Sequence, residues 1–524
     1  MQRRDFLRQL LLAGTAAGLG TALGSAPRRL RNVVLLIGDD HSARVLGCFG
    51  NPLIRTPNLD RLARQGTRFT RTFAQSPICS ASRQSFLTGQ YPHQTGVNLL
   101  FTSFSDERNV TIAEHLKVQG YRTAALGKMH TNNQQAHGFE LRADGTEYQR
   151  WLKAKGGPKP VPAGVPVRDM GTTKGMQPGI WLNPGVRPEP LYDDDSLDTY
   201  LARQAAEFIT ANRENPFLLF VGFHAPHAPM NFPVEFAGRY RPEQMPLGRK
   251  SADDERWIPK IFRDFSPEQK REVVAGYYTC VEYLDKNVGL VLDALRTNGL
   301  DDDTLVVYTS DHGYLLDDHG RFEKHTMWEP AVQTPLLVRA PGLGKPGRVS
   351  DELVELVDLA PTFTAATGTP PLTPTQGKSL LPLLRNPRAE HRDAIFSEYL
   401  IDRLAMLRTD DYKYVFTTGE HDLGVGYETG HAPFGPTQWL FDLRNDPDEL
   451  RNLAADPRQA SRLRAMQDQL IQIFQRTHPD AAKLPPGLTA EQTLAWFCEP
   501  RDEVAELEKK LFPDPKRYEL RFKK

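Results

Sequence analysis

The stretch NVVLLIGDDH, residues 32–41, joins an uninterrupted run of apolar residues to a pair of aspartates. A short continuous apolar run that is rich in branched side chains is typical of a strand buried on both faces, as in a parallel sheet. The polar residues after the run predict a loop at the end of that strand. We therefore expect residues 32–41 to form a buried parallel strand that leads into a polar loop.

The same pattern recurs along the chain, with helical segments between the apolar runs. Further strands are expected within 111–130, 216–229, 303–313 and 334–342, and helices over 56–66 and 272–298. Strands that alternate with helices predict an α/β fold, with a doubly wound, mostly parallel central sheet flanked by helices. In such sheets, ligands bind beyond the carboxyl ends of the strands. Two stretches rich in proline and glycine, 140–195 and 230–262, are expected to be irregular insertions at that edge.

The pattern changes near residue 395. From there AIFSEYL, LAMLRTDDYKYVF and TQWLFDLRNDPDELRNL indicate shorter strands joined by turns, followed by a helix over 456–476 and a charged tail. The change predicts a main α/β domain over 30–394. It also predicts a C-terminal subdomain over 395–524, made of a small antiparallel sheet, a packing helix and a tail.

The first 29 residues have the composition of an export signal. Arg3 and Arg4 form a twin arginine, which precedes an apolar run rich in glycine and alanine and then small residues before a proline. This arrangement predicts a twin-arginine signal peptide over 1–29, with an uncleaved membrane anchor as the alternative. The run is short for a membrane span, so we expect no span after signal cleavage. The protein is then expected to be periplasmic or secreted.

The composition argues against a strongly charged binding protein. The 524 residues include 65 Lys and Arg against 65 Asp and Glu, a balance that gives no long-range attraction to nucleic acid or to an anionic membrane. We expect no nucleic-acid partner, and an anionic ligand would need a local cluster of cations. The four cysteines are too widely spaced for a disulfide framework.

Two predicted strand ends carry groups that can hold a metal ion. Asp39 and Asp40 follow the first strand, and Asp311 and His312 follow the strand within 303–313. Together they offer three carboxylates and an imidazole, which suits Ca²⁺ or Mg²⁺, with Ca²⁺ favoured because it tolerates irregular ligation. Each aspartate pair alone is also explained by helix capping or loop solvation, and imidazole is more usual on transition metals. The two pairs together favour a cation site.

Cationic side chains follow the other predicted strands. Lys128 and His130, two residues apart in GKMH, point the same way from a strand end and can face one anion. In HAPHAP, prolines stiffen two histidines, of which His227 favours a site more strongly than His224; surface loop histidines are the alternative. Lys324 lies in the loop after the metal-bearing strand, where a solvated lysine is the plain alternative. Cations that face a metal indicate a site for an oxyanion ester.

Cys79, in SPICSASRQSFLTG (76–89), lies where the sequence predicts the start of a helix. The first turn of a helix offers free backbone N–H groups and the positive end of the dipole, which stabilise negative charge. Cys79 is therefore either a nucleophile or a small buried apolar residue. A plain thiolate suits a hard cation poorly, so a catalytic residue 79 is expected to become a group that bears oxygen.

The segment CSASR resembles the C-x-[P/A]-x-R signature of type I sulfatases, whose cysteine is oxidised to formylglycine. The motifs LLIGDDH, GKMH, HAPHAP, SDHG and LFDLRNDPDELRNL also resemble that family in its order, over roughly residues 30–455. The H-x-P-H-x-P and S-D-H-G forms are most similar to the iduronate-sulfatase-like branch. Ala81 stands where many members have proline, and His312 where asparagine is common. The resemblance implies the alkaline-phosphatase-superfamily fold.

The resemblance also implies roles for the candidate residues. The ligands of the cation would be Asp39, Asp40, Asp311, His312 and the formylglycine made from Cys79. Lys128 and Lys324 would neutralise the sulfate oxygens, and Arg83 would fix the hydrated aldehyde. His227 would protonate the departing alcohol, alone or together with Lys324, and His130 would take a proton from residue 79. A formylglycine-generating maturation enzyme is implied as a partner.

The implied activity is hydrolysis of a sulfate ester, either of a sulfated glycan or of another sulfated small molecule. A phosphonate or phosphate ester hydrolase of the same superfamily would share most of these residues and is one alternative. A non-catalytic, carbohydrate-binding pseudo-sulfatase is another, but it would need broken site positions, and here every position is filled.

Overall fold

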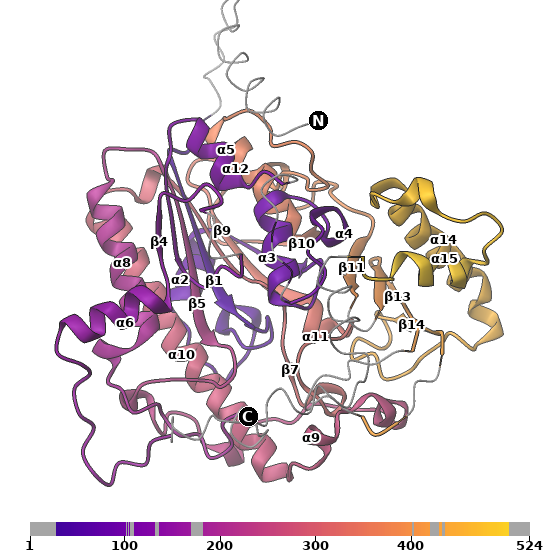
Figure 1. Ribbon diagram of the computed structural model, residues 1–524, viewed down its shortest axis with the longest axis horizontal. Helices are drawn as coiled ribbons and strands as arrows, with labels where there is room; N and C mark the ends of the chain where they lie inside the picture. The colour runs from indigo at the N-terminus through magenta and orange to yellow at the C-terminus, as the bar shows by residue number, and fades with distance from the viewer. Residues whose placement is uncertain are drawn as a thin grey trace, which may run out of the picture.

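The computed structural model describes residues 28–501, apart from 101, 103, 105–108, 132–135, 169–181, 401–402, 420–428 and 432–434. An eight-stranded sheet lies at the centre, with helices on both faces, and a four-stranded sheet lies beside it (Figure 1). The strands of the central sheet follow the order β10 (Arg348–Glu355), β2 (Thr67–Phe73), β9 (Gln333–Arg339), β6 (Thr304–Ser310), β1 (Asn32–Asp39), β5 (Phe217–Pro226), β3 (Arg122–Gly127) and β4 (Leu141–Ala143).

Most neighbouring strands of this sheet are parallel. β1 pairs in parallel with β5 on one side and with β6 on the other, and β3 pairs in parallel with β5 and β4. β9 runs antiparallel to both of its neighbours, β2 and β6. The predicted fold class, a mostly parallel α/β sheet flanked by helices with a small antiparallel sheet, is confirmed. The carboxyl ends of β1, β3, β5 and β6 lie at one edge, as parallel strands require.

All eight residues of β1 are buried, as its apolar sequence predicts. Successive side chains point to opposite faces of the sheet. Val34 and Leu36 accordingly belong to one apolar core, while Val33 and Leu35 belong to another. Truncation of one of these side chains to alanine would cost about 2–5 kcal/mol, the usual range for a buried aliphatic residue.

Helices cover both faces of the sheet (Figure 1). The core with Val34 includes side chains from α2 (Pro57–Gln65), α8 (Leu197–Ala211) and α10 (Pro267–Thr297). The core with Val33 includes side chains from α3 (Cys79–Thr88), α5 (Ile112–Val118) and α12 (Leu359–Thr367). α10 begins before the predicted residue 272, because the Ser266 hydroxyl caps it by accepting from the N–H of Gln269.

The second sheet is antiparallel and is covered by C-terminal helices. Its strands follow the order β11 (Ile395–Tyr399), β12 (Leu404–Arg408), β13 (Tyr412–Thr417) and β14 (Thr437–Asp442). α14 (Ala460–Thr477) packs on it through Leu470 and Phe474. The sequence predicts a charged tail after this helix, but α15 (Ala490–Phe497) forms there. Its Phe497 ring stacks on Phe474 with 5.0 Å between centroids, because Leu494 and Phe497 give the segment an apolar face.

Part of the predicted insertion 140–195 is regular. Strand β4 extends the sheet, and α6 (Gly145–Ala154) follows it directly. Asp144 caps α6 by accepting from the N–H of Thr146, and Tyr148 and Leu152 bury one face of the helix. The spacing of these two residues, four apart, is a helical signal that the abundance of proline and glycine nearby obscures.

The predicted signal peptide, 1–29, lies outside the described residues except for Arg28 and Arg29. Within the part of the chain that the structure describes, no helix has the length and apolar character needed to span a membrane.

Candidate active site

The residues predicted to form a site converge at the carboxyl edge of the central sheet. Asp40 follows β1, Lys128 follows β3, His227 follows β5 and Asp311 follows β6. Hydrogen bonds, ion pairs or charge interactions link all ten of them: Asp39, Asp40, Cys79, Arg83, Lys128, His130, His227, Asp311, His312 and Lys324.

Two consecutive aspartates face the same centre because the backbone turns at the second one. On a regular strand, Asp39 and Asp40 would point to opposite faces. Asp40 instead has a φ of 64°, a left-handed conformation that aspartate tolerates better than most residues. Its N–H donates to Oδ1 of Asp311 (3.1 Å), and the Tyr277 hydroxyl donates to its carbonyl oxygen (2.6 Å). Carboxylate oxygens of Asp39, Asp40 and Asp311 therefore all lie within 4.8 Å of one another.

Two lysines neutralise the first pair of aspartates. Lys128 donates to Oδ2 of Asp39, and Lys324 donates to both carboxylate oxygens of Asp40 at 2.6 and 2.7 Å. Burial alone would raise the pKa of Asp39, but the charge of Lys128 lowers it below its usual range. Burial likewise opposes the charge on Lys324, but the Asp40 carboxylate raises the pKa of this lysine above its usual value. Both lysines are thus cations that face the carboxylate cluster.

Arg83 ties two strand ends to the loop after β3. Its Nε donates to Oδ2 of Asp311 at 2.9 Å, and its Nη2 donates to Oδ1 of Asp39 at 3.0 Å. Its Nη1 donates to the carbonyl oxygen of Lys128 at 2.5 Å. The side chain is completely buried, as are both of its carboxylate partners. These bonds make Arg83 a positioning residue, because each of its three nitrogens is bound to the framework.

Cys79 is the first residue of α3 and lies at the centre of these charges. Its Sγ is 3.3 Å from Nε2 of His312, 3.5 Å from Nζ of Lys128 and 3.7 Å from Nζ of Lys324. Burial would raise the pKa of the thiol, but the two lysines and His312 lower it well below its usual value. A side chain at this position is therefore prepared to carry negative charge, as its place in the first turn of a helix also favours.

The acidic cluster fits a divalent cation. Nδ1 of His312 faces the carbonyl oxygen of Gly313 at 2.9 Å, so it carries the proton, and Nε2 points toward Cys79 and Asp40. Burial raises the pKa of Asp311 to about 6 although Arg83 opposes it. Burial disfavours the charged His312, but Asp311 raises the pKa of this histidine to about 9. Burial thus disfavours the charge on Asp311, while the surrounding negative charge favours protonation of His312, and a bound cation would oppose both effects. The donors, three carboxylates and one imidazole nitrogen, suit Ca²⁺ or Mg²⁺ better than a soft metal.

Two further histidines flank the centre. Gln84, on α3, holds His130 by donating from Nε2 to its carbonyl oxygen at 2.7 Å. Desolvation by the neighbouring groups lowers the pKa of His130, so the neutral imidazole can accept a proton. Nδ1 of His227 hydrogen bonds the carbonyl oxygen of Ala228, which leaves Nε2 3.7 Å from Oδ2 of Asp40. Burial opposes protonation of His227, but Asp40 raises its pKa above the usual value.

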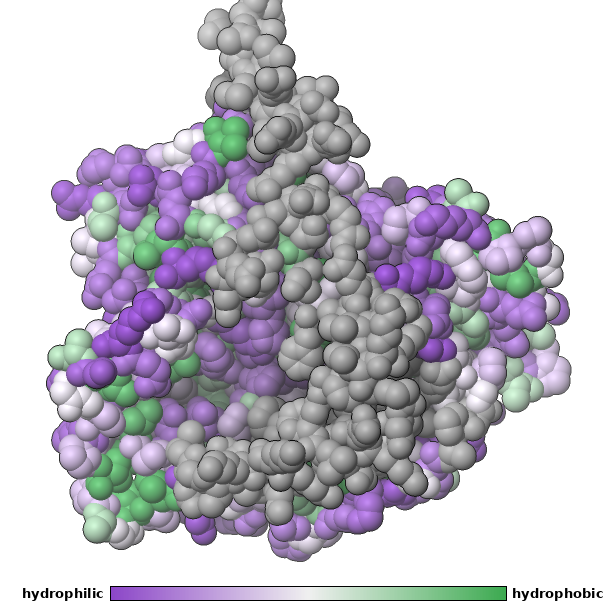
Figure 2. Space-filling model, viewed as in Figure 1, coloured by the Kyte–Doolittle hydropathy of each residue, from purple (hydrophilic) through white to green (hydrophobic). Residues whose placement is uncertain are grey.

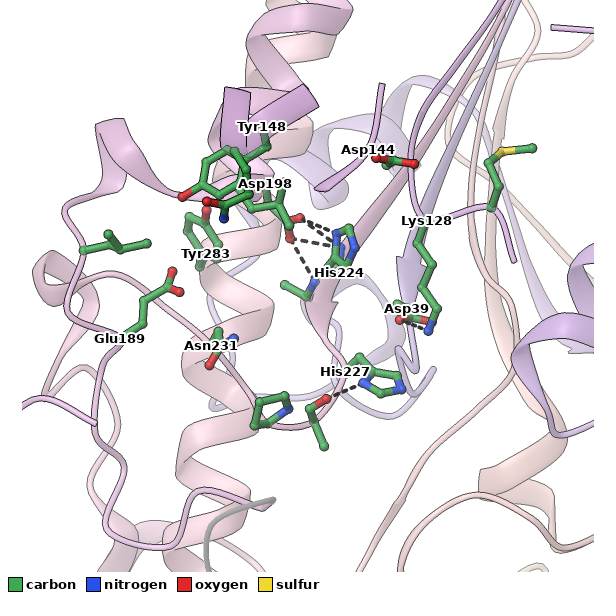
Figure 3. Close-up of a pocket in the computed structure, with 18 of the residues that line it drawn as sticks. Asp39, Lys128, Asp144, Tyr148, Glu189, Asp198, His224, His227, Asn231 and Tyr283 are labelled. Carbon is green, nitrogen blue, oxygen red and sulfur yellow. Dashed lines mark hydrogen bonds and ion pairs between the residues drawn. The ribbon is translucent and has the colours of Figure 1, made fainter. Parts of the chain in front are cut away.

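A cavity of about 720 Å³ opens from this centre, and Asp39, Lys128, His130 and His227 line one end of it. Figure 3 shows Glu189, Tyr283 and Tyr148 on the opposite side from Lys128 and Asp39. In the space-filling view, the surface over β1 and β5 is hollowed and mainly hydrophilic (Figure 2). The reaction centre therefore adjoins a cavity much larger than a sulfate group.

Several residues of this cavity are not predicted from the sequence. Asp198, near the start of α8, accepts backbone N–H groups of His224 (2.9 and 3.1 Å) and Ala225 (2.8 Å), and so fixes the turn that carries His227. In the sequence, an aspartate two residues after Ser196 indicates only a helix start. Glu189 lies in a stretch without a periodic pattern, so no local signal distinguishes it.

Family models match most of the chain. Residues 31–369 match the model described as Sulfatase. Residues 317–476 match the model described as N-sulphoglucosamine sulphohydrolase, C-terminal.

Curated relatives and solved structures are similar over most of their length. Iduronate 2-sulfatase of Homo sapiens is 30% identical over 440 residues, which cover 71% of this chain and 77% of that protein. Steryl-sulfatase of Mus musculus is 29% identical over 600 residues, which cover 93% of this chain and 89% of that protein. The phosphonate monoester hydrolase of Agrobacterium radiobacter superposes with a TM-score of 0.73 at 23% identity, covering 87% of this chain and 97% of that one. This last likeness shows a shared fold.

Proposed function

Because the chain belongs to the sulfatase family, within the alkaline phosphatase superfamily, and is a sulfuric ester hydrolase, we propose a mechanism for it. It cleaves sulfate esters with a formylglycine made from Cys79 and with a divalent cation. The observation that carries the proposal is the position of Cys79. Its Sγ lies within 4 Å of Lys128, Lys324, His312 and Asp40, at the start of a helix. The membership removes the non-catalytic alternative.

The cation would be held by Asp39, Asp40, Asp311 and His312 together with residue 79. Three carboxylates from irregular loops favour Ca²⁺ over Mg²⁺, which requires a nearly octahedral site. A bound cation would polarise the sulfuryl group, and the hydrated aldehyde of residue 79 would supply the attacking hydroxyl. Lys324 donates to both oxygens of Asp40, and the remaining lone pairs of this carboxylate could bind the cation at the same time.

The lysines and histidines would act on the substrate and on residue 79. Lys128 and Lys324 have their Nζ atoms 3.5 and 3.7 Å from Sγ of Cys79 and would neutralise the sulfate oxygens as negative charge develops there. His227 would protonate the departing alcohol through Nε2, because its Nδ1 is held by Ala228. His130 would accept a proton from residue 79, since its lowered pKa favours the neutral imidazole.

A phosphonate or phosphate monoesterase is the second candidate. The phosphonate monoester hydrolases of Agrobacterium radiobacter and Silicibacter pomeroyi superpose with TM-scores of 0.73 and 0.70. Both oxyanions have tetrahedral geometry and would meet the same lysines. Rates of hydrolysis for matched nitrophenyl sulfate and nitrophenyl phosphonate separate the two candidates, and we expect the sulfate to react faster.

The substrate class follows from relatives by analogy. N-acetylglucosamine-6-O-sulfatase of Bacteroides thetaiotaomicron is 25% identical over 524 residues, and iduronate 2-sulfatase of Homo sapiens is 30% identical over 440 residues. We propose a sulfated carbohydrate as substrate. We also propose that a formylglycine-generating enzyme modifies Cys79 and that the twin-arginine pathway then exports the folded protein to the periplasm or beyond.

Mass spectrometry of the peptide that contains Cys79 tests the mechanism. Active enzyme is expected to have lost the sulfur of residue 79 and to carry an aldehyde that reacts with a hydrazine probe. A Cys79→Ala variant should show neither the aldehyde nor turnover of nitrophenyl sulfate. Full activity in a preparation that contains only cysteine at this position would refute the mechanism.

A further inference from the structure

The cavity beside the reaction centre has the size of a pocket for a small organic ligand. Its volume is about 720 Å³, within the range of roughly 300–1,000 Å³ that is usual for such pockets. Lys128 and His227 line the end where the sulfate would react, so the rest of the space faces the alcohol portion of the ester. The residues lining that remainder therefore decide which alcohols fit.

Two of the carboxylates that line the remainder are used by the protein itself. Asp144 accepts from the N–H of Thr146 as the cap of α6. Asp198 is buried, and both of its oxygens accept backbone N–H groups from the turn that begins at His224. Neither group is free to change partners without disturbing the local backbone.

Glu189 differs from these two carboxylates. Its backbone is fixed, because its N–H donates to Phe232 O (3.0 Å) and its carbonyl oxygen accepts from the N–H of Leu191 (2.8 Å). Its side chain extends into the cavity on the side opposite Lys128 (Figure 3). Burial and the nearby charge of Asp198 raise the pKa of Glu189 to about 7, while Ser196 and Arg168 lower it only in part. A hydroxyl or ammonium donor from a ligand would stabilise this carboxylate.

Positive charge is scarce in the same region. Among the lining residues that the structure describes, Arg142 and His224 are the cationic side chains away from the sulfate end. Arg142 lies near Asp144, whose pKa it lowers, and Nδ1 of His224 lies 3.4 Å from Asp198. Arg168 is not a lining residue and donates to Pro229 O and to Asn231 Oδ1. An anionic group on the alcohol portion would therefore meet Glu189, whose charge Arg168 balances only in part.

We propose that Glu189 is the specificity-determining residue of this cavity, accepting a hydroxyl or ammonium group of the substrate alcohol and disfavouring a second anion. The enzyme then prefers sulfate esters of neutral or amino sugars over esters of uronic acids and over disulfated rings. This inference rests on the proposed hydrolysis of carbohydrate sulfates. It adds a prediction that can fail while that function holds.

The test compares pairs of sulfated pyranosides that carry the sulfate at the same position and differ only in CH₂OH or carboxylate at carbon 5. Above about pH 7, where Glu189 is mostly ionised, we expect kcat/KM of the wild-type enzyme to be about tenfold higher on the neutral member, because the carboxylate of the other member meets a like charge. Glu189→Gln keeps the size of the side chain and removes the charge, so the ratio should fall toward one. Glu207→Gln, on an exposed position of α8, is the matched control and should keep the wild-type ratio.

Binding of the desulfated sugars, measured by calorimetry, repeats the comparison without turnover. The neutral sugar should bind more tightly to the wild-type protein, and Glu189→Gln should bind the pair alike. Equal treatment of the pair by the wild-type protein, or an unchanged ratio in Glu189→Gln, would overturn the proposal. If the wild-type protein does not hydrolyse nitrophenyl sulfate, the result counts against the proposed function. The binding comparison still tests whether Glu189 determines specificity.

Discussion

Arg83 and Asp311 form an ion pair that is closed to solvent: the Nε of Arg83 lies 2.9 Å from Oδ2 of Asp311, and both side chains are 0% exposed. The same guanidinium also binds Asp39 at 3.0 Å. α3, which carries residue 79, is thereby joined to the ends of β1 and β6. The pair couples the position of the nucleophile to that of the metal ligands.

Arg83→Met should destabilise the protein, because it leaves Asp39 and Asp311 buried without their shared cation. Breaking a buried ion pair by removing one partner usually costs about 3–5 kcal/mol. Chemical unfolding of the cation-free protein, followed by circular dichroism, measures this loss. Arg444→Met, which removes an exposed pair with Asp411, is the control and should change stability little. Equal stability of the two variants would show that Arg83 does not hold the site together.

Asp311→Asn should abolish calcium binding and turnover while the protein stays folded. The amide keeps the shape of the side chain but removes one of the three clustered negative charges. Asp302→Asn is the matched control, because it makes the same change at an exposed aspartate just before β6, at the opposite end of the strand from Asp311. Metal analysis after dialysis gives the occupancy. A full complement of calcium in Asp311→Asn would exclude this residue as a ligand.

The stability of the cation-free protein should depend on pH through the same residue. Burial raises the pKa of Asp311 to about 6, above the value of about 3.9 that is usual in an unfolded chain. The folded state therefore binds this proton more readily, and the contribution to stability is lost as the pH rises from about 4 through 6. Calcium requires the ionised carboxylate, so it should raise Tm more at about pH 7.5 than at about pH 5. An equal rise in Tm at both values would contradict this role.

The sequence predicts the strands and the residues at their ends better than it predicts their mutual arrangement. β1 and its aspartates follow from a local pattern, since the apolar run and the polar end are adjacent in the chain. The left-handed turn at Asp40 does not follow from a local pattern, because it depends on hydrogen bonds to Asp311 and Tyr277, which lie far away in the sequence. The position of Glu189 in the cavity is not predicted for a similar reason, since its backbone is held by Phe232 of another insertion. Long-range hydrogen bonds of this kind produce no periodic pattern in the sequence.

Replacing Arg3 and Arg4 together with lysine should retain the protein in the cytosol. The export pathway reads the arginine pair, and lysine keeps the charge but not the guanidinium. Fractionation of cells, followed by immunoblotting, locates the protein. A variant with Arg28 and Arg29 changed to lysine controls for the loss of arginine near the N-terminus. Unchanged delivery to the periplasm in the Arg3 and Arg4 variant would refute the predicted signal.

His130→Ala should slow a step that all substrates share. This histidine is proposed to take the proton from residue 79 after the alcohol has left, so the nature of the alcohol does not matter. Steady-state turnover should fall by a similar factor for sugar sulfates and for nitrophenyl sulfate, and a burst of nitrophenolate should precede the slow phase. Imidazole added to the variant should restore part of the rate. A loss confined to sugar sulfates would instead place His130 at the leaving group.

His227→Ala should affect substrates in proportion to how much their leaving group needs a proton. The Nε2 of His227 faces the cavity while Nδ1 is held by Ala228, which fits a donor to the departing oxygen. A sugar alkoxide cannot leave without a proton, and general acid catalysis supplies roughly 10²–10⁴-fold where it is needed. A nitrophenolate leaves unaided, so the rate with nitrophenyl sulfate should fall far less.

Lys324 is the competing acid. Asp40 binds the Lys324 ammonium at 2.6 and 2.7 Å and raises the pKa of this lysine, which makes Lys324 a poor proton donor. Single-turnover rates on an alkyl sulfate and on nitrophenyl sulfate decide between them: equal losses in His227→Ala would transfer the role to Lys324.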